Sequence, residues 1–540
     1  MLPSASWGTD REPRKTRKLE THEKTSFREL TVMGRSHDAI VIGAGHNGLI
    51  AATFLAKAGL KTLVLERSDR VGGCAWLSHT ASIDPGVIRA LDLARHGLEI
   101  VRPDVSACAP DVDGRPPLML WRDPARAAQS IRAFSSKDAD QYPKFLASFA
   151  RISGVLRALS SAAPPSVDEP SRADLFEALK AGRRFRALGR ADAYRLLRWM
   201  PMAVADLAGE WFESEPLRAA VAAGGILGSF LGPWSAGSAA VLLLLGATEA
   251  DPIATGWFAK GGAAALVDAL AAAARAAGVQ IRTSADVAQV AVAGGGATGV
   301  VLTSGEEIQA RAIVSSADPK RTFGLVDPIH LAPEFVRRVQ NIRGHGTLAA
   351  VTYTVSAPPR FTSLAVLDPR EQAAALASRV RLGRNIDTIE RAFDAAKYGS
   401  FSDEPWVELT AFDSTVAAYV QYAPYHLRGT TWEIERERLA KVTTRVIARY
   451  APGFEASVLG HQVTTPLDLE GRYGLTGGHI FHGDLALDQL FVTRPLLGFA
   501  RYGTPVRNLY ICGSGTHPGT GLNGLSGTLA AREIVRAMKR

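Results

Sequence analysis

The sequence predicts an α/β protein in which a Rossmann fold is joined to an α+β domain. Three observations carry this prediction: a glycine motif near the start, an acidic residue that closes the following strand, and a second glycine-rich segment near the end. With 540 residues, the chain exceeds a single compact core, so we expect two or three domains.

The first glycine motif follows a short apolar run. Residues 39–42 are Ala-Ile-Val-Ile, and Gly43, Gly45 and Gly48 follow with GxGxxG spacing, ahead of a helix that we expect from Leu49. In a dinucleotide site the first glycine permits the tight turn, the second admits the pyrophosphate, and the third lets helix pack on strand. The helix N-terminus offers free N–H groups and the positive end of its dipole to the phosphates.

A second strand, Lys61–Leu65, ends in Glu66, about twenty residues past the glycines, where a carboxylate accepts hydrogen bonds from a ribose. Arg67-Ser-Asp-Arg70-Val-Gly72-Gly73 follows directly. A basic residue before a Gly-Gly pair at this place resembles the continuation seen in FAD-binding flavoproteins, which nicotinamide enzymes do not usually show. A surface turn is the alternative, but behind a complete motif we favour FAD.

Composition is that of a soluble globular protein, with 46% hydrophobic and 21% charged residues. The net charge of +9 is spread thinly, so we expect no nucleic-acid partner, while peripheral contact with an anionic membrane stays open. Cys74, Cys108 and Cys512 show neither a CxxC pair nor metal-ligand spacing. We therefore expect no metal site and a reducing compartment, the cytoplasm. Residues 1–35 lack the apolar core of a secretory signal and predict a flexible tail.

The next part of the chain mixes strands and helices. Residues 101–123, proline-rich with short apolar runs, predict strands and turns. Residues 135–138, with a serine or Asp138 available as cap, open a helix that continues to about Leu156, and residues 160–171 predict a loop. The basic segment 183–198 predicts a helix with a solvated face, with membrane-surface docking as the alternative.

Residues 219–247 contain no charged residue, and this length would allow a membrane span. However, glycines and the turn sequence Gly232-Pro233-Trp234-Ser235 interrupt the segment. We therefore expect two buried helices joined by a turn, which could also form a wall of an apolar substrate pocket.

A helix followed by a small β-meander comes next. Dinucleotide-binding folds insert such a unit before the chain returns to the main sheet. At the start of the meander, Val287 can place its backbone against adenine; an ordinary strand valine is the alternative. The predicted elements are a helix over 266–277 and strands over 279–283, 287–292, 300–302 and 308–316.

Residues 318–500 predict the rest of the second domain, with strands at Val351–Val355 and Val416–Gln421 and a charged amphipathic helix over Trp432–Tyr450. The C-terminal segment predicts a strand over 508–512, a glycine-rich loop over 513–524 and a helix from about Thr528 to Met538. Its helix N-terminus suits a phosphate or the pyrimidine edge of a flavin. Because several hundred residues separate the two glycine-rich units, they must meet in space, as the two halves of an FAD site do.

Together these elements predict a two-dinucleotide-domain (glutathione-reductase-like) FAD-binding Rossmann fold with an α+β substrate domain. We expect the chain to divide into a flexible tail (1–35), FAD-binding parts (36–110, 256–325 and 501–540) and substrate-domain parts (111–255, helical, and 326–500).

Several motifs, taken together, resemble the phytoene-dehydrogenase-like family of FAD oxidoreductases, from about Ser36 to the end. Within it they are most similar to the branch named "pyridine nucleotide-disulfide oxidoreductase domain-containing protein 2". The motifs are GAGHNGL (43–49), RVGGC (70–74), QYAPYH (421–426), GGHIFHG (477–483) with Asp488–Leu490, and GSGTHPG (513–519).

The resemblance implies a flavoprotein with noncovalent FAD and an apolar small-molecule substrate. His482 and His426 are candidates for handling a proton, although a core histidine bonded to backbone is the more ordinary interpretation of either. The implied FAD contacts are Gly43, Gly45, His46, Asn47, Gly48, Glu66, Arg67, Arg70, Gly72, Gly73, Val287, Gly513, Ser514, Leu522, Asn523 and Gly524.

The sequence departs from the family at three places. The segment after Cys74 looks shorter than usual, a second shortening lies near Thr410–Val416, and Gly519-Thr-Gly521 stands where relatives often show three glycines. The first departure lies where relatives line the flavin and the substrate entrance, so it bears on turnover.

Three functions therefore follow as hypotheses. The first is a dehydrogenase or desaturase that exchanges a hydride between an isoprenoid- or lipid-like substrate and flavin N5. The second is C–N oxidation, as in amine oxidases that share the cofactor fold, although the sequence shows no convincing aromatic pair to face the flavin. The third is a flavin-binding scaffold or interaction protein with little turnover.

Overall fold

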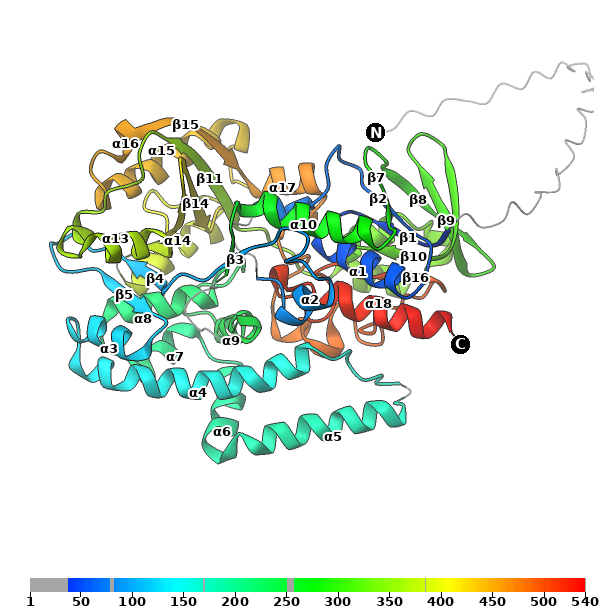
Figure 1. The fold of residues 1–540 in the computed structure, drawn as a ribbon, viewed down its shortest axis with the longest axis horizontal. Helices are drawn as coiled ribbons and strands as arrows, with labels where there is room; N and C mark the ends of the chain where they lie inside the picture. Colours follow the sequence, from blue (N-terminus) through cyan, green and yellow to red (C-terminus); the bar gives the residue numbers. More distant parts are fainter. Residues whose placement is uncertain (1–36, 78–81, 169, 250–256, 384, 540) are drawn as a thin grey trace, which may run out of the picture.

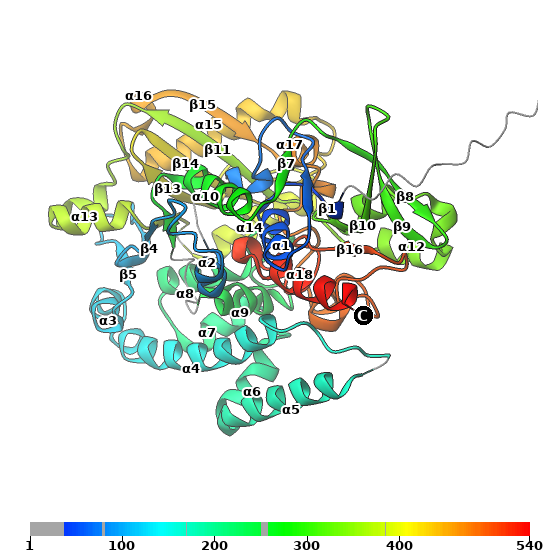
Figure 2. The same cartoon turned by 45° about the vertical axis from the view of Figure 1, so that its right-hand side comes forward.

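The computed structural model describes residues 37–77, 82–168, 170–249, 257–383 and 385–539. The predicted tail over 1–35 lies outside these ranges, as does part of the shortened segment after Cys74. Two lobes, each built around a seven-stranded sheet, lie side by side above a layer of helices (Figures 1 and 2).

The first sheet forms the dinucleotide-binding lobe and confirms the predicted fold class. Its order is β7-β2-β1-β10-β9-β8, with β16 pairing to β10. Pairing is parallel from β7 through β2, β1 and β10 to β16, whereas β8, β9 and β10 form the predicted antiparallel meander. The strands are β1 (His37–Ile42), β2 (Thr62–Leu65), β7 (Gln280–Arg282), β8 (Val287–Ala293), β9 (Gly296–Leu302), β10 (Glu307–Ser315) and β16 (Leu509–Ile511).

Both faces of this sheet are covered, which explains its continuous apolar runs. Val41, Val64 and Val314 pack under the helices of one face, and Ile40 and Ile313 pack on the other. The first face carries α1 (His46–Lys57), α2 (Pro85–Ala90), α10 (Gly262–Ala276) and α18 (Leu525–Met538); α11 (Pro319–Gly324) and α12 (Pro333–Gln340) follow β10 on the other side.

The second sheet has the order β15-β11-β14-β13-β12-β4-β5 and is antiparallel except where β12 meets β4. Although β4 lies inside the range 36–110, which we predicted for the FAD-binding part, it pairs in this second sheet. The strands are β4 (Val105–Ala109), β5 (Leu118–Trp121), β11 (Leu348–Val355), β12 (Arg379–Leu382), β13 (Val407–Phe412), β14 (Thr415–Gln421) and β15 (Val458–Thr464), and a separate pair joins β3 (Ile100–Val101) to β6 (Phe258–Ala259).

Helices pack on this sheet and complete the larger hydrophobic core. The predicted helix over Trp432–Tyr450 is confirmed as α15. Of the caps that residues 135–138 offer, Ser135 caps α4 (Ser136–Ser160) by accepting from the backbone N–H of Asp138. The remaining helices are α3 (Pro124–Arg132), α5 (Arg172–Ala187), α6 (Gly189–Trp199), α7 (Val204–Trp211), α8 (Glu215–Ala222), α9 (Ser238–Glu249), α13 (Pro369–Leu376), α14 (Ile386–Lys397), α16 (Phe454–Ser457) and α17 (Pro466–Tyr473).

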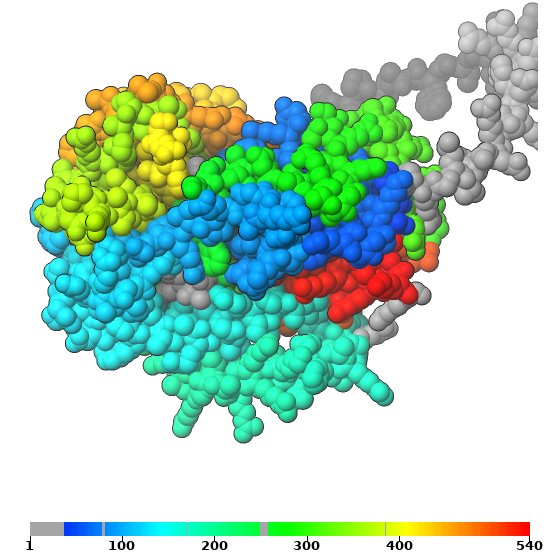
Figure 3. Space-filling model, in the orientation of Figure 1, coloured from blue at the N-terminus to red at the C-terminus, as the bar shows by residue number. Residues whose placement is uncertain are grey.

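The uncharged segment 219–247 ends α8, passes through turns and enters α9, so the prediction of two buried helices is confirmed. No helix within the described ranges is long and apolar enough to cross a membrane. The basic segment 183–198 is split between α5 and α6, which protrude as a ridge at the lower surface (Figure 3). Leu175, Phe176 and Leu179 of α5 are more than half exposed there.

Candidate functional site

A cavity lies where the carboxyl ends of β1, β2 and β10 meet the loop after β16, the edge at which open α/β sheets bind ligands. It continues to the second sheet, so one space is lined by both lobes. The loops of the first sheet contribute Gly43–Asn47 (except Ala44), Glu66–Ser68, Ser316–Asp318 and Ser514 to its wall.

The three glycines of the first motif perform the roles that the spacing predicts. Gly43 has a φ of +91°, a left-handed conformation, and a Cβ there would lie 2.6 Å from Ser316 Oγ. Gly45 precedes α1, and a Cβ on it would meet no protein atom within 4 Å. A Cβ on Gly48 would lie 2.1 Å from the carbonyl oxygen of Gly43, so this glycine permits close packing of helix on strand. The open side at Gly45 leaves room for a phosphate at the start of α1, whose first turn has no side-chain cap.

Glu66 closes β2 with its carboxylate fixed at the cavity wall. The backbone N–H of Ala44 donates to Oε2 at 2.7 Å, and the N–H of Ser68 donates to Oε1 at 3.0 Å. Because a carboxylate has further acceptor sites, Glu66 can still accept from a ribose hydroxyl. Val287 lines the same end of the cavity at the start of β8.

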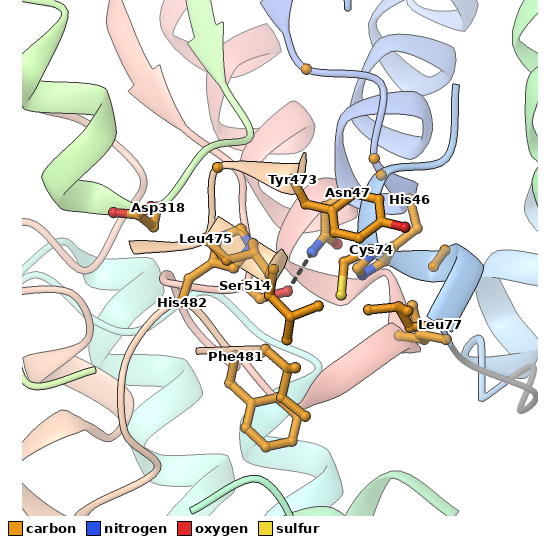
Figure 4. Close-up of a pocket in the computed structure, with 18 of the residues that line it drawn as sticks. His46, Asn47, Cys74, Leu77, Asp318, Tyr473, Leu475, Phe481, His482 and Ser514 are labelled. Atoms are coloured by element: carbon orange, nitrogen blue, oxygen red, sulfur yellow. Dashed lines mark hydrogen bonds between the residues drawn. The ribbon is translucent and has the colours of Figure 1, made fainter. Parts of the chain in front are cut away.

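The two glycine-rich units do meet, as predicted. Asn47 Nδ2 donates to Ser514 Oγ at 3.2 Å (Figure 4). Asn47 Oδ1 accepts from the backbone N–H of Gly527 at 3.2 Å. A Cβ on Gly527 would lie 2.3 Å from the Asn47 carbonyl oxygen, so α1 and α18 approach closely at this point. The front and back of the chain therefore form one wall.

Not every predicted contact reaches the cavity. Arg70 is exposed above the Trp76 ring, and Gly72 pairs with Gly45 behind the wall. Asn523 caps the turn before α18 by accepting from the N–H of Leu525. Predicted residues that line the cavity are Gly43, Gly45, His46, Asn47, Glu66, Arg67, Gly73, Val287, Ser514 and Leu522; those outside its lining are Gly48, Arg70, Gly72, Gly513, Asn523 and Gly524.

Of the two histidines that the sequence suggests for handling a proton, only His482 lines the cavity. Its backbone has a left-handed φ of 58°, and its buried Nδ1 has no hydrogen-bond partner. Across the cavity, His46 Nε2 is likewise buried and without a partner (Figure 4). Burial lowers the pKa of each imidazole to about 4, so both are neutral at pH 7. His426 lies exposed at the surface against the Tyr425 ring, outside this lining.

Arg494 is a residue that the sequence analysis missed. Its side chain is buried, and its guanidinium donates to the carbonyl oxygens of Phe481 (2.7 Å) and Ser514 (2.9 Å). Further bonds reach the carbonyls of Gly483 and Asp484. Burial lowers its pKa to about 10. Arg494 thus fixes the loop that carries His482 against the loop that carries Ser514.

The rest of the lining is largely apolar, with a polar patch on the second sheet. Tyr473, at the end of α17, and Phe481, in the loop after it, supply aromatic rings to the lining (Figure 4). The apolar lining includes Leu77, Leu227, Leu245, Leu348, Leu469, Leu475 and Ile480, and the polar patch consists of Arg379, Glu408, Thr410 and Tyr419.

The residues present suit a dinucleotide cofactor. Gly45 leaves an open cradle at an uncapped helix N-terminus, Glu66 keeps acceptor capacity, and His46, whose buried Nε2 has no partner, lines the same cavity. In the described part of the chain, no group of three or more His, Cys, Asp or Glu side chains could hold a metal ion.

Residues 215–535 match the family described as flavin containing amine oxidoreductase, and residues 41–102 match a NAD(P)-binding Rossmann-like domain. A curated relative from Rattus norvegicus, pyridine nucleotide-disulfide oxidoreductase domain-containing protein 2, is 34% identical over 93% of this chain and 94% of its own. A phytoene desaturase (lycopene-forming) from Pantoea ananas is 24% identical over 91% of this chain and 97% of its own.

Among solved structures, cyclohexylamine oxidase from Brevibacterium oxydans IH-35A superposes with a TM-score of 0.54 at 18% identity, covering 93% of this chain and 100% of the other. At that identity the likeness shows the fold. The family match and the rat relative cover the predicted cofactor and substrate parts together, and they confirm a flavin cofactor.

Proposed function

The chain belongs to the flavin-containing amine oxidoreductase family, and from this premise we propose that it is an FAD-dependent dehydrogenase that exchanges a hydride between an apolar, isoprenoid- or lipid-like substrate and flavin N5. One observation carries the proposal: a single cavity runs from the dinucleotide loops to the second sheet with an apolar stretch between them. An apolar substrate would lie there beside the flavin ring.

The protein's own residues would bind the cofactor and orient the substrate. The N-terminus of α1 and the open side of Gly45 would hold the pyrophosphate, and Glu66 would accept from the ribose. When bound, FAD supplies the two-electron chemistry, taking up or returning the hydride at N5. Leu227, Leu245 and other apolar side chains would exclude water.

His482 is the best-placed group for the accompanying proton. Its buried Nδ1 has no partner, and its lowered pKa keeps it neutral and able to accept a proton from substrate. Replacing His482 with glutamine and following flavin reduction against pH tests this role. Unchanged turnover and pH profile with bound FAD would remove His482 from the mechanism.

We propose that FAD is held without a covalent bond. Cys74 is the cysteine that lines the cavity, and burial raises the pKa of its thiol to about 12, so the thiol is a poor nucleophile. The three cysteines are free in the described structure, which supports a reducing compartment such as the cytoplasm.

Amine oxidation is the second candidate, favoured by the rings of Tyr473 and Phe481 in the cavity lining. Tyr473 ends α17 and Phe481 lies eight residues later in the loop that follows, so no motif in the sequence marks them as an aromatic pair. Anaerobic titration with alkenes and with primary and secondary amines separates the two reactions, because only the correct class would bleach the flavin absorbance.

The first experiment is flavin analysis of the purified protein. A yellow preparation that releases FAD on denaturation is expected, and a colourless preparation that cannot be reconstituted would overturn the proposal. Flavin that photoreduces but responds to no donor would instead favour the scaffold hypothesis.

A further inference from the structure

The second sheet presents polar side chains to the cavity and apolar side chains to the core. On β13, Val407 and Leu409 belong to the hydrophobic core, whereas Glu408 and Thr410 line the cavity. Tyr419 of β14 lies opposite Glu408 and lines it too. Such alternation is usual for a sheet with one face in water. Here, however, Glu408 and Thr410 are each only 2% exposed.

Glu408 is held ionised inside this wall. Arg379 contacts its Oε1, and Arg381 Nε donates to Oε2 at 2.9 Å. Burial acts to raise the pKa of the Glu408 carboxyl, but the two guanidinium charges outweigh burial and hold the pKa below its usual value. Well-packed apolar residues stabilise a fold at least as well as a buried ion pair. Charges kept at the wall of a substrate cavity therefore suit contact with a ligand.

Thr410 gives the independent sign of a ligand. Its hydroxyl is buried without a hydrogen-bond partner, whereas buried hydroxyls in native proteins are normally paired. The residue paired with it on β14 is Ala417, which offers no side-chain partner. Thr410 lines the cavity, so a molecule bound there can supply the missing partner.

We propose that Thr410, Glu408 and Arg379 form a subsite for an oxygen-bearing head group, a hydroxyl or a carboxylate, on a substrate whose remainder is apolar. The inference rests on the proposed function, because the apolar remainder would extend toward the flavin past Leu245 and Phe481. The substrate class becomes an amphipathic alcohol or acid rather than a pure hydrocarbon.

The test compares 1-octanol, octanoate and 1-octene, which share a chain length, by isothermal titration calorimetry on the FAD-loaded protein. Thr410→Val removes the hydroxyl while keeping the side-chain shape, and Thr410→Ser restores it. Thr443→Val is the matched control, since Thr443 is buried in α15 and its hydroxyl is satisfied by the Leu439 carbonyl at 2.7 Å.

Thr410→Val is expected to weaken binding of octanol or octanoate by about fivefold or more, as loss of one hydrogen bond would. The affinity for 1-octene should change by less than about twofold, and Thr410→Ser should recover most of the loss. Whether Thr410→Val weakens binding of octanol or of octanoate shows whether the subsite takes a hydroxyl or a carboxylate. Equal effects on all three ligands, no effect, or no binding by wild type would overturn the subsite. Flavin content, measured on the same preparations, separately tests the proposed function.

Discussion

The side-chain amide of Asn47 donates a 3.2 Å hydrogen bond to the hydroxyl of Ser514, which lies 467 positions away in the sequence. The same side chain accepts from the N–H of Gly527 at the start of α18. This one residue therefore holds together the two glycine-rich segments on which the cofactor site depends.

Replacing Asn47 with leucine, of similar volume, should lower the free energy of unfolding by about 2–3 kcal/mol, because the buried N–H of Gly527 loses its acceptor. Urea unfolding measures this loss. Ser514→Ala removes the other bond only and should cost less. Equal stability of wild type and Asn47→Leu would contradict the bridging role.

Gly45→Ala should impair FAD binding, whereas Gly48→Ala should impair folding. A Cβ on Gly45 meets no protein atom, so stability should change by less than about 1 kcal/mol while FAD affinity falls at least about tenfold. A Cβ on Gly48 collides with the Gly43 carbonyl, so folding should weaken by about 2–4 kcal/mol. Thermal unfolding and flavin fluorescence separate the two effects; a Gly45→Ala protein that binds FAD normally would argue against a phosphate at this position.

Stability should fall as the pH drops from about 6.5 to about 4. His46, His482 and His517 each have a folded-state pKa that burial lowers to about 4 from 6.5, so unfolding takes up protons in this window. Each histidine contributes a loss on the order of 3 kcal/mol at most. The hydrogen bond to Asp484 raises the pKa of His345, so this histidine changes the stability in the opposite direction.

Urea unfolding at pH 7, 5.5 and 4.5 measures this loss. His482→Gln should flatten the dependence, and a pH-independent midpoint in wild type would contradict the buried, neutral state of these rings.

Arg494→Gln should destabilise the protein by about 3–5 kcal/mol, because several buried carbonyls lose a charged donor together. Exposed Arg337 offers a control, and Arg337→Gln should change stability by less than about 0.5 kcal/mol. If Arg494→Gln unfolds at the same urea concentration as wild type, Arg494 does not fix the His482 loop.

The ridge of α5 should bind anionic vesicles. Leu175, Phe176 and Leu179 are exposed beside a run of arginines, as in helices that lie on membrane surfaces. Phe176→Glu with Leu179→Glu should abolish cosedimentation with phosphatidylserine vesicles, and neutral vesicles serve as the control. If the wild-type protein does not sediment with the vesicles, this helix has a solvated face and does not dock on membranes.

Residues around the first sheet were predictable because their chemistry is local. A strand, three glycines and a terminal acid follow one another within thirty residues, and each role appears in the structure. The main error was the start of α1, which begins at His46 rather than Leu49. Gly48, taken as the end of the loop, instead lies inside the first turn of the helix, where close packing requires it.

The wall contributed by the second sheet was not predictable in the same way. Glu408 and Thr410 alternate with apolar residues, a pattern equally typical of a solvent-facing strand, and only tertiary packing buries them. Arg494 gave no signal either, because its partners are main-chain carbonyls that any sequence supplies.

The parallel part of the first sheet is assembled from strands that begin at residues 37, 62, 280, 307 and 509. During synthesis the flavin pocket therefore stays unfinished until Ser514 and Gly527 have emerged from the ribosome. Cofactor insertion must be a late event in biogenesis, and a nascent chain arrested before β16 should accumulate without flavin.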